Sequence, residues 1–100
     1  MIKELEIIYY KQADKFFNKH WDIRDEFEKL IKKVLYNDHP EQVNFKRLKG
    51  NLRGLMRIAI DGYRIIYRVE NGKIIIVTVM LAGSRGDVYK HLGKLKSSSV

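Results

Sequence analysis

The spacing of apolar positions in the first forty residues predicts one short strand followed by two helices. Residues 4–10 are rich in Ile and Tyr, which is typical of a strand. The apolar positions that follow fall at helical spacing in two groups: Ala13, Phe16, Phe17 and His20, then Ile23, Phe27, Leu30, Ile31 and Val34. Asp22 is placed to cap the second helix, and Pro40 cannot continue it. We therefore expect a strand and then a helical hairpin.

From Phe45 onward the pattern changes to β-branched runs punctuated by glycine. Four strands are expected, over residues 45–50, 55–60, 63–70 and 73–81. Asp61-Gly62 and Asn71-Gly72 suit two-residue type I′ turns, because both central residues of that turn need positive φ. The predicted fold is α+β: an N-terminal strand, a two-helix hairpin packed on a mainly antiparallel sheet, and a short C-terminal helix or turn from Asp87 to about Leu92.

The turn at Asp61-Gly62 fixes which side chains share a face of the sheet. It pairs Ala59 with Arg64, and side chains alternate between faces along each strand. One face is apolar and is expected to pack under the helices; it carries Met56, Ile58, Ile60, Tyr63, Ile65, Tyr67 and Val69. The opposite face gathers three cations: Arg57, Arg64 and Arg68.

A turn at Asn71-Gly72 extends this register into the last strand. It pairs Arg64 with Val79 and Arg68 with Ile75. The arginine face then gains an apolar floor of Ile75, Val77, Val79 and Leu81. Clustered like charges repel one another unless an anion lies among them, and the planar fork of arginine suits phosphate. We interpret this face as a phosphate site; an ordinary solvated sheet face is the alternative.

Charge supports a polyanionic partner. The chain has 100 residues and a net charge of +8, and residues 43–100 hold 12 of the 20 Lys and Arg but only three of the 12 Asp and Glu. A basic half on a small domain is the electrostatic footprint of nucleic-acid binding, although basic residues can also simply keep a domain soluble. Because 45% of the residues are hydrophobic and the chain is short, we expect one domain over residues 1–100 with a single core.

Several classes of function are excluded by composition. The chain has no Cys, which removes disulfides, thiolate chemistry and Cys-based zinc sites. No apolar run is long enough for a membrane span, and the first residues, MIKELEIIYY, lack the apolar core of a signal peptide. We expect a cytoplasmic protein with no metal, no cofactor and no membrane partner.

The second half also carries family motifs. The segment LKGNLRGLMRIAIDGYRIIYRVENGKIIIVTVMLAGSRGDVYK resembles the C-terminal half of the RelE/ParE toxin superfamily. Its markers are the segments 48–50 (Leu-Lys-Gly), 61–67 and 83–89, and the predicted elements of residues 4–82 follow the order of that fold. The resemblance implies the toxin of a type II toxin-antitoxin system, specifically a RelE-type mRNA interferase.

The resemblance also implies site residues. In RNA-cutting members the arginine of the hairpin, an arginine after the last strand and a later tyrosine form the working site, which here match Arg64, Arg85 and Tyr89. Some members also carry lysine on the strand before the hairpin. The corresponding positions here are Leu55 and Arg57, which departs from the pattern, and we expect Arg57 to join the site. Ser84 departs from the pattern, since many relatives have His at this position. We expect nearby cations to bind RNA: Lys46, Lys49, Arg53 and Arg68.

The expected reaction is metal-independent attack of an RNA 2′-hydroxyl on the adjacent phosphate, with mRNA held on the ribosome. The expected partners are the ribosome, mRNA and a RelB-like antitoxin, whose complex with the toxin would bind operator DNA. Two alternatives stay open at this point. One is a ParE-like gyrase inhibitor, and the other is a non-catalytic nucleic-acid-binding module.

Overall fold

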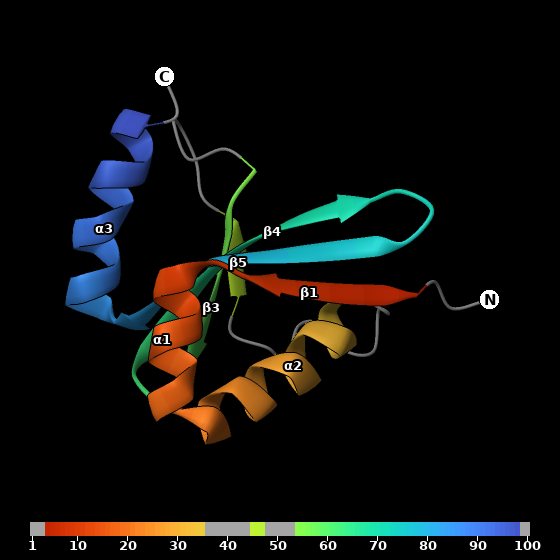
Figure 1. The fold of residues 1–100 in the computed structure, drawn as a ribbon, viewed down its shortest axis with the longest axis horizontal. Helices are drawn as coiled ribbons and strands as arrows, with labels where there is room; N and C mark the ends of the chain where they lie inside the picture. Colours follow the sequence, from red (N-terminus) through yellow and green to blue (C-terminus); the bar gives the residue numbers. More distant parts are fainter. Residues whose placement is uncertain (1–3, 36–44, 48–53, 99–100) are drawn as a thin grey trace.

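The structure, a computed structural model, describes residues 4–35, 45–47 and 54–98. Its elements in chain order are β1 (Leu5–Tyr9), α1 (Lys11–Lys19), α2 (Trp21–Leu35), β2 (Phe45–Arg47), β3 (Met56–Ile60), β4 (Tyr63–Asn71), β5 (Ile75–Ser84) and α3 (Arg85–Ser98) (Figure 1). This order confirms the predicted α+β fold. Pro40, predicted to end the second helix, lies outside the described residues.

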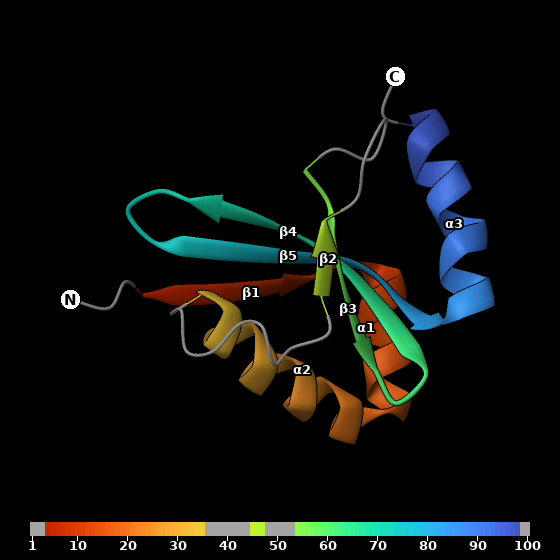
Figure 2. The same cartoon turned by 180° about the vertical axis from the view of Figure 1, so that it is seen from behind.

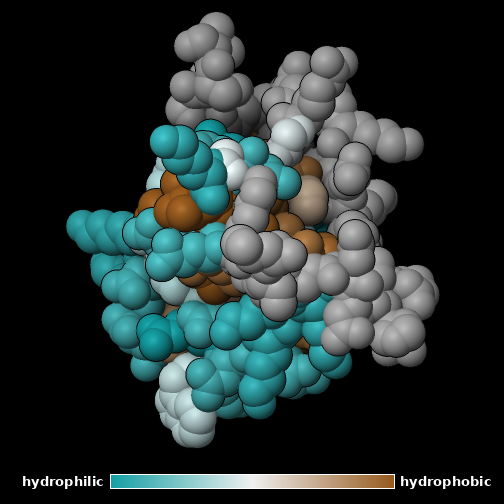
Figure 3. All heavy atoms as spheres, turned by 90° about the vertical axis from the view of Figure 1, so that its right-hand side faces the viewer, coloured by the Kyte–Doolittle hydropathy of each residue, from teal (hydrophilic) through white to brown (hydrophobic). Residues whose placement is uncertain are grey.

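The described strands form one sheet in the order β1-β5-β4-β3-β2 (Figure 2). β1 runs parallel to β5, and the other neighbours are antiparallel. The sheet is therefore mainly antiparallel, as expected. β1 lies beside β5 at one edge of the sheet. The helices α1 and α2 then carry the chain across one face to β2 at the other edge. Viewed from the end at which the β4–β5 hairpin turns, the described residues present a mainly hydrophilic surface with apolar side chains between (Figure 3).

The main core lies between the sheet and the helical hairpin of α1 and α2. Its helical residues are Ala13, Phe17, Ile23, Phe27 and Ile31, all buried. Phe27 meets Tyr67 of β4 edge to face, with ring centroids 5.9 Å apart. Full burial of each large apolar side chain contributes about 1.5–3 kcal/mol. The predicted apolar face of β3 and β4 is confirmed, since its members belong to this core or pack against it.

The start of α2 differs from the prediction. The helix begins at Trp21, so Asp22 lies inside its first turn and not ahead of it as a cap. The backbone N–H groups of Ile23 and Arg24 donate to the carbonyl of His20, each at 3.1 Å. His20 therefore takes the position before the helix, and the Asp22 carboxylate lies where the helix dipole favours a negative charge.

The first hairpin forms as predicted. Asp61 and Gly62 have φ of 48° and 83°, the positive values that a type I′ turn requires. The register follows, with Ala59 opposite Arg64 and Arg57 opposite Ile66.

The second hairpin was predicted wrongly. Asn71 pairs with Ile75, so residues 72–74 form a three-residue connection, and Gly72 N–H donates to the Ile74 carbonyl at 3.1 Å. Together with a bulge at Ile66/Tyr67, this places Arg64 opposite Gly83 and Arg68 opposite Thr78.

The changed register also moves most of the predicted apolar floor. Ile75, Val77 and Val79 turn to the face covered by α1 and α2, where they are buried in the main core. A shift by an odd number of residues exchanges the two faces of a strand, and burial of three β-branched side chains favours this register. Leu81 keeps its predicted place on the arginine face, because the bulge restores the alternation beyond it.

That arginine face is partly covered by α3. Val88 and Leu92 of α3 pack on Ile66 and Leu81 of the sheet and form a second, smaller core. The predicted short helix or turn is thus a helix of 14 residues, Arg85–Ser98. None of the described helices is both long and apolar enough to cross a membrane.

Two side-chain contacts tie the helical hairpin to the sheet. Gln12 of α1 donates to the carbonyl of Ala82 at 2.8 Å and accepts from its N–H at 2.9 Å. The amide thereby replaces a neighbouring strand where β1 has ended. Tyr9 of β1 donates to Glu28 of α2, and burial, followed by this bond, raises the pKa of the Tyr9 hydroxyl above its ordinary value.

Candidate functional site

Arg64 lies near the start of β4, on the face that α3 covers. Its cross-strand neighbour on β5 is Gly83, which has no side chain, and Gly83 lies close to Val88 of α3. The arginine is half-buried, and its Nη1 donates to the carbonyl of Tyr63 at 3.2 Å. One donor of the Arg64 guanidinium is thus used within its own strand, and its other donors can reach a ligand.

Arg85 follows the last strand, as expected, and is the first residue of α3. Ser84 stands before it, and its Oγ accepts a hydrogen bond from the Asp87 N–H at 3.3 Å, as a helix cap does. The position where many relatives have His thus has a local structural role here. One turn along the helix, the Tyr89 ring lies under the Arg85 guanidinium, whose Cζ is 5.7 Å from the ring centroid.

Tyr89 does not fasten α3 to the sheet. Its side chain is 43% exposed, whereas Val88 and Leu92 are almost fully buried and hold the helix down. Tyr89 and Arg85 therefore present an aromatic ring and a guanidinium together to the outside. The arrangement suits an unstacked base next to a phosphate.

Arg57 and Arg68 share the face of Arg64, as the register predicted. Arg57 is opposite Ile66, and Arg68 is opposite Thr78. Arg68 also has an acidic neighbour, since its Nη2 lies 3.7 Å from a carboxylate oxygen of Glu70. This ion pair is well exposed and therefore weak, yet it offsets part of the charge of Arg68.

Of the remaining predicted RNA-binding residues, Lys46 belongs to β2 at the edge of the sheet. Lys46 of β2 is paired with Arg57 of β3, so the backbone register brings these two positions together. Lys49 and Arg53 lie outside the described residues. The structure thus places Lys46 next to the arginine face.

Arg64 and Arg85 share an electrostatic property, because the charge of each is not neutralised by a carboxylate of a described residue. Both lie at the same end of the β4–β5 pair, because Arg64 is opposite Gly83 and Arg85 follows soon after it. Two guanidinium forks so placed can bind the oxygens of one phosphate from two sides.

His91 lies on the other flank of α3. Its Nδ1–H donates to the Asp87 carbonyl at 2.8 Å, within the helix. Residues two apart on a helix do not face each other, so His91 points away from Tyr89. Its nearness in sequence to Tyr89 therefore does not bring it to the arginines.

Among the described residues, no group of three or more His, Asp or Glu side chains is arranged to hold a metal ion.

Comparison with known proteins decides the family. A model of the family described as "ParE toxin of type II toxin-antitoxin system, parDE" matches residues 4–85. The chain belongs to the ParE toxin family. This confirms the RelE/ParE resemblance, and the protein is a toxin of a type II toxin-antitoxin system. The matched range includes Arg57, Arg64 and Arg85 and ends before Tyr89.

Solved structures share the fold of this ParE-family toxin. YafQ from E. coli strain BL21(DE3) is 15% identical, with 86% of this chain and 99% of that chain covered and a TM-score of 0.60. A chain of the RelB-RelE antitoxin-toxin complex from Methanococcus jannaschii is 24% identical, with 84% and 96% covered and a TM-score of 0.57. The YoeB/ParE toxin from Agrobacterium tumefaciens is 13% identical, with 80% and 98% covered and a TM-score of 0.56. No curated protein matched the sequence.

Proposed function

We propose that this toxin is a ribosome-dependent endoribonuclease that cuts mRNA and so arrests translation and growth. The observation that carries the proposal is the placement of Arg64 and Arg85 at one end of the β4–β5 pair, with the exposed ring of Tyr89 beneath Arg85. Fixed cations beside an aromatic ring suit one reacting phosphate and the base attached to it.

The proposed reaction begins with attack of the RNA 2′-oxygen on the neighbouring phosphorus. The new O2′–P bond forms while the bond from phosphorus to the 5′-oxygen breaks, which leaves a cyclic phosphate and a free 5′-hydroxyl. The nucleophile loses one proton and the leaving oxygen gains one, so no other reactant is needed. Arg64 and Arg57 stabilise the charge that develops on the phosphoryl oxygens. Arg85 binds the phosphate from the side of α3 and donates toward the leaving oxygen.

None of these arginines can accept the proton of the 2′-hydroxyl, because an arginine side chain stays protonated below about pH 12. The proposal therefore assigns an essential part to the ribosome, which holds the mRNA with attacking and leaving oxygens in line. Such positioning can supply much of the rate of a phosphate transfer. Lys46 and Lys49 are proposed to bind the RNA backbone, together with Arg53 and Arg68.

The direct test compares cleavage of one mRNA by the purified toxin with and without ribosomes. We expect cuts in the translated region only when ribosomes are present, with 5′-hydroxyl ends. Equal cleavage of free RNA would contradict ribosome dependence, and no cleavage in either case would contradict the enzymatic proposal.

Gyrase inhibition is the second candidate, because the family model that matches is that of the ParE toxin. In this case the basic face would bind a protein target and cut no RNA. Supercoiling by purified gyrase, with and without the toxin, separates the two. Inhibition of gyrase without mRNA cleavage would favour the second candidate, and a non-catalytic nucleic-acid-binding module would show steep salt dependence of RNA binding but neither activity.

We further propose that a RelB-like antitoxin binds this toxin and covers the arginine face. The charge of +8 favours an acidic partner segment, and the structural relative from Methanococcus jannaschii comes from an antitoxin-toxin complex. The resulting complex would bind operator DNA through the antitoxin. Co-purification with the product of an adjoining open reading frame tests the partnership.

A further inference from the structure

The lysines of α1 form a second basic surface. Lys11, Lys15 and Lys19 follow one another at four-residue spacing, so helix geometry places them along one side of α1. All three are exposed, and none has an ion pair with a described residue. We call these three residues the lysine row. The first 42 residues hold nine Asp and Glu, only one of them on α1, so a count of charge over this half of the chain hides the row.

The lysine row is unfavourable for the helix that carries it. Like charges at i, i+4 repel one another along a helix. Lys11 also lies in the first turn, where the helix dipole disfavours a cation. Asp14 is the one acidic residue of α1. A bound anion would remove these repulsions, which is the arrangement expected of a binding surface.

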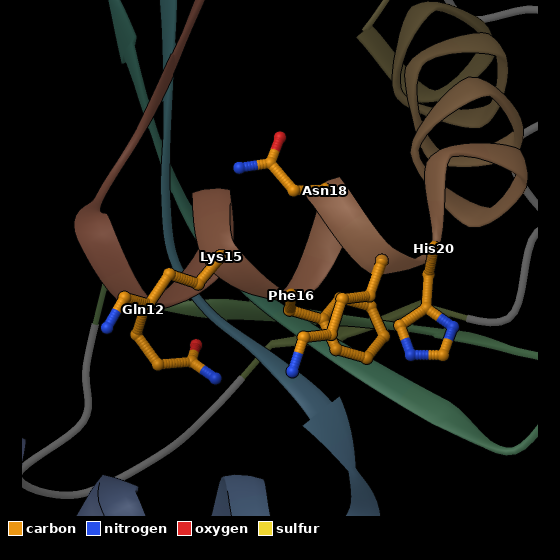
Figure 4. A pocket seen from close by; sticks show the side chains of 6 residues that line it. Gln12, Lys15, Phe16, Asn18 and His20 are labelled. Atoms are coloured by element: carbon orange, nitrogen blue, oxygen red, sulfur yellow. The ribbon is translucent and has the colours of Figure 1, made fainter.

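A cavity with an aromatic wall adjoins the row. It has a volume of about 520 Å³ and is lined by Gln12, Lys15, Phe16, Asn18, Lys19 and His20. The rings of Phe16 and His20 are stacked, with centroids 4.4 Å apart and planes at 23°. Figure 4 shows the two rings side by side, with Asn18 pointing away from them. Lysines beside stacked rings are the groups that bind single-stranded nucleic acid, through its phosphates and its bases respectively.

The cavity and the arginine site lie on opposite faces of the sheet and approach each other at the end of β5. Tyr63 packs edge to face on Phe16, with centroids 5.1 Å apart, and the next residue along the strand is Arg64. Gln12, at the opposite end of the cavity lining, is bonded to Ala82, shortly before Arg85. The lysine row therefore adjoins the end of β5 that also carries Arg85.

We propose that the lysine row and its cavity bind a single-stranded RNA segment that continues from the arginine site. Lys15 and Lys19 contact phosphates, and a base stacks on the Phe16–His20 pair. The choice of RNA as partner rests on the proposed function. An acidic protein segment would satisfy the lysines but would leave the aromatic wall unused, so RNA fits both features.

Binding of a short, fluorescently labelled 2′-O-methyl oligouridine to the full chain, measured over a range of salt concentrations, tests the proposal. This probe lacks the attacking hydroxyl, so the measurement does not depend on cleavage. For K15Q/K19Q we expect at least about tenfold weaker binding at low salt and a salt slope smaller by about 1.4, because each phosphate contact to a single strand contributes about 0.7. The matched control K29Q/K33Q removes two exposed lysines at the same spacing from α2 and should bind like the wild type.

An unchanged affinity and slope for K15Q/K19Q would overturn the inference, as would an equal loss in the control. The base contact is tested with H20A and H20F against the same probe and an abasic one. We expect H20A to weaken binding of the base-bearing probe alone and H20F to restore it. Equal binding of polyglutamate, with the same dependence on Lys15 and Lys19, would reassign the surface to an acidic protein. If the toxin cuts no mRNA but these binding results hold, the proposed enzymatic function fails and the RNA surface stands.

Discussion

Arg85 lies over the ring of Tyr89 one helical turn away, with its guanidinium carbon 5.7 Å from the ring centroid. This contact couples the two residues of α3 that the proposed mechanism uses. A cation over an exposed aromatic ring gains about 0.5–1 kcal/mol, enough to favour one orientation of a long side chain. Tyr89 thus positions Arg85 and offers its own face to a base.

This relationship predicts different results for two substitutions of Tyr89. Tyr89→Phe keeps the ring and should retain most mRNA cleavage, whereas Tyr89→Ala should reduce it about tenfold or more, since stacking on an aromatic residue contributes about 1–3 kcal/mol per base. Initial rates on ribosome-bound mRNA measure both. Equal loss in the two variants would show instead that the phenol hydroxyl takes part in proton transfer.

A second prediction concerns Arg64. Arg64→Ala should lower the cleavage rate about 10²–10³-fold and abolish growth arrest, because it removes a donor to the charge that develops on the phosphate. Arg24→Ala removes the same charge from an exposed pair on α2 and serves as the control. Circular dichroism of both variants should match the wild type. Undiminished toxicity of a folded Arg64→Ala protein would refute the assignment of this site.

The Gln12 contact gives a prediction about stability. Gln12→Ala leaves the N–H and the carbonyl of Ala82 without their side-chain partner, and we expect a loss of about 1–3 kcal/mol in the free energy of unfolding. Asn18→Ala is the matched control, because this amide on the same helix has no hydrogen bond to a described residue. Urea denaturation measures both variants. Equal midpoints for Gln12→Ala and wild type would show that water replaces the contact without cost.

The Tyr9 hydroxyl predicts how stability depends on pH. Its pKa is raised in the folded protein, mainly by burial and then by the bond to Glu28, so the folded state holds this proton more tightly than the unfolded state. The contribution is complete below about pH 10, the ordinary pKa of tyrosine, and is lost as the pH rises through the folded pKa. Above pH 10 the free energy of unfolding should fall by up to about 1.4 kcal/mol per pH unit more than in Tyr9→Phe. Parallel pH profiles of the two proteins would contradict this account.

The sequence predicted the parts of the fold that depend on local signals. Asp61-Gly62 determines the first hairpin, because positive φ at both positions is a local requirement. Asn71-Gly72 carries the same signal, yet the structure forms a longer connection there. The run of apolar residues beyond it permits more than one register, and burial of Ile75, Val77 and Val79 against the helices decides between them.

The candidate site was predictable in its residues but not in its surroundings. Arg57, Arg64 and Arg68 follow from strand alternation, and Arg85 and Tyr89 from family motifs. The extent of α3 was not predicted, because its segment is mostly polar; among its described side chains, Val88 and Leu92 mark the buried side. The lysine row was missed for another reason, since charge was averaged over half of the chain, where acidic residues outside α1 offset its lysines.

The most direct test of the central claim maps the 5′ ends of cellular RNA after brief induction of the toxin. The account predicts new 5′-hydroxyl ends within translated regions, which disappear with Arg64→Ala and when translation initiation is blocked. Growth arrest without new ends, or new ends that are as frequent in untranslated RNA, would contradict ribosome-dependent cleavage.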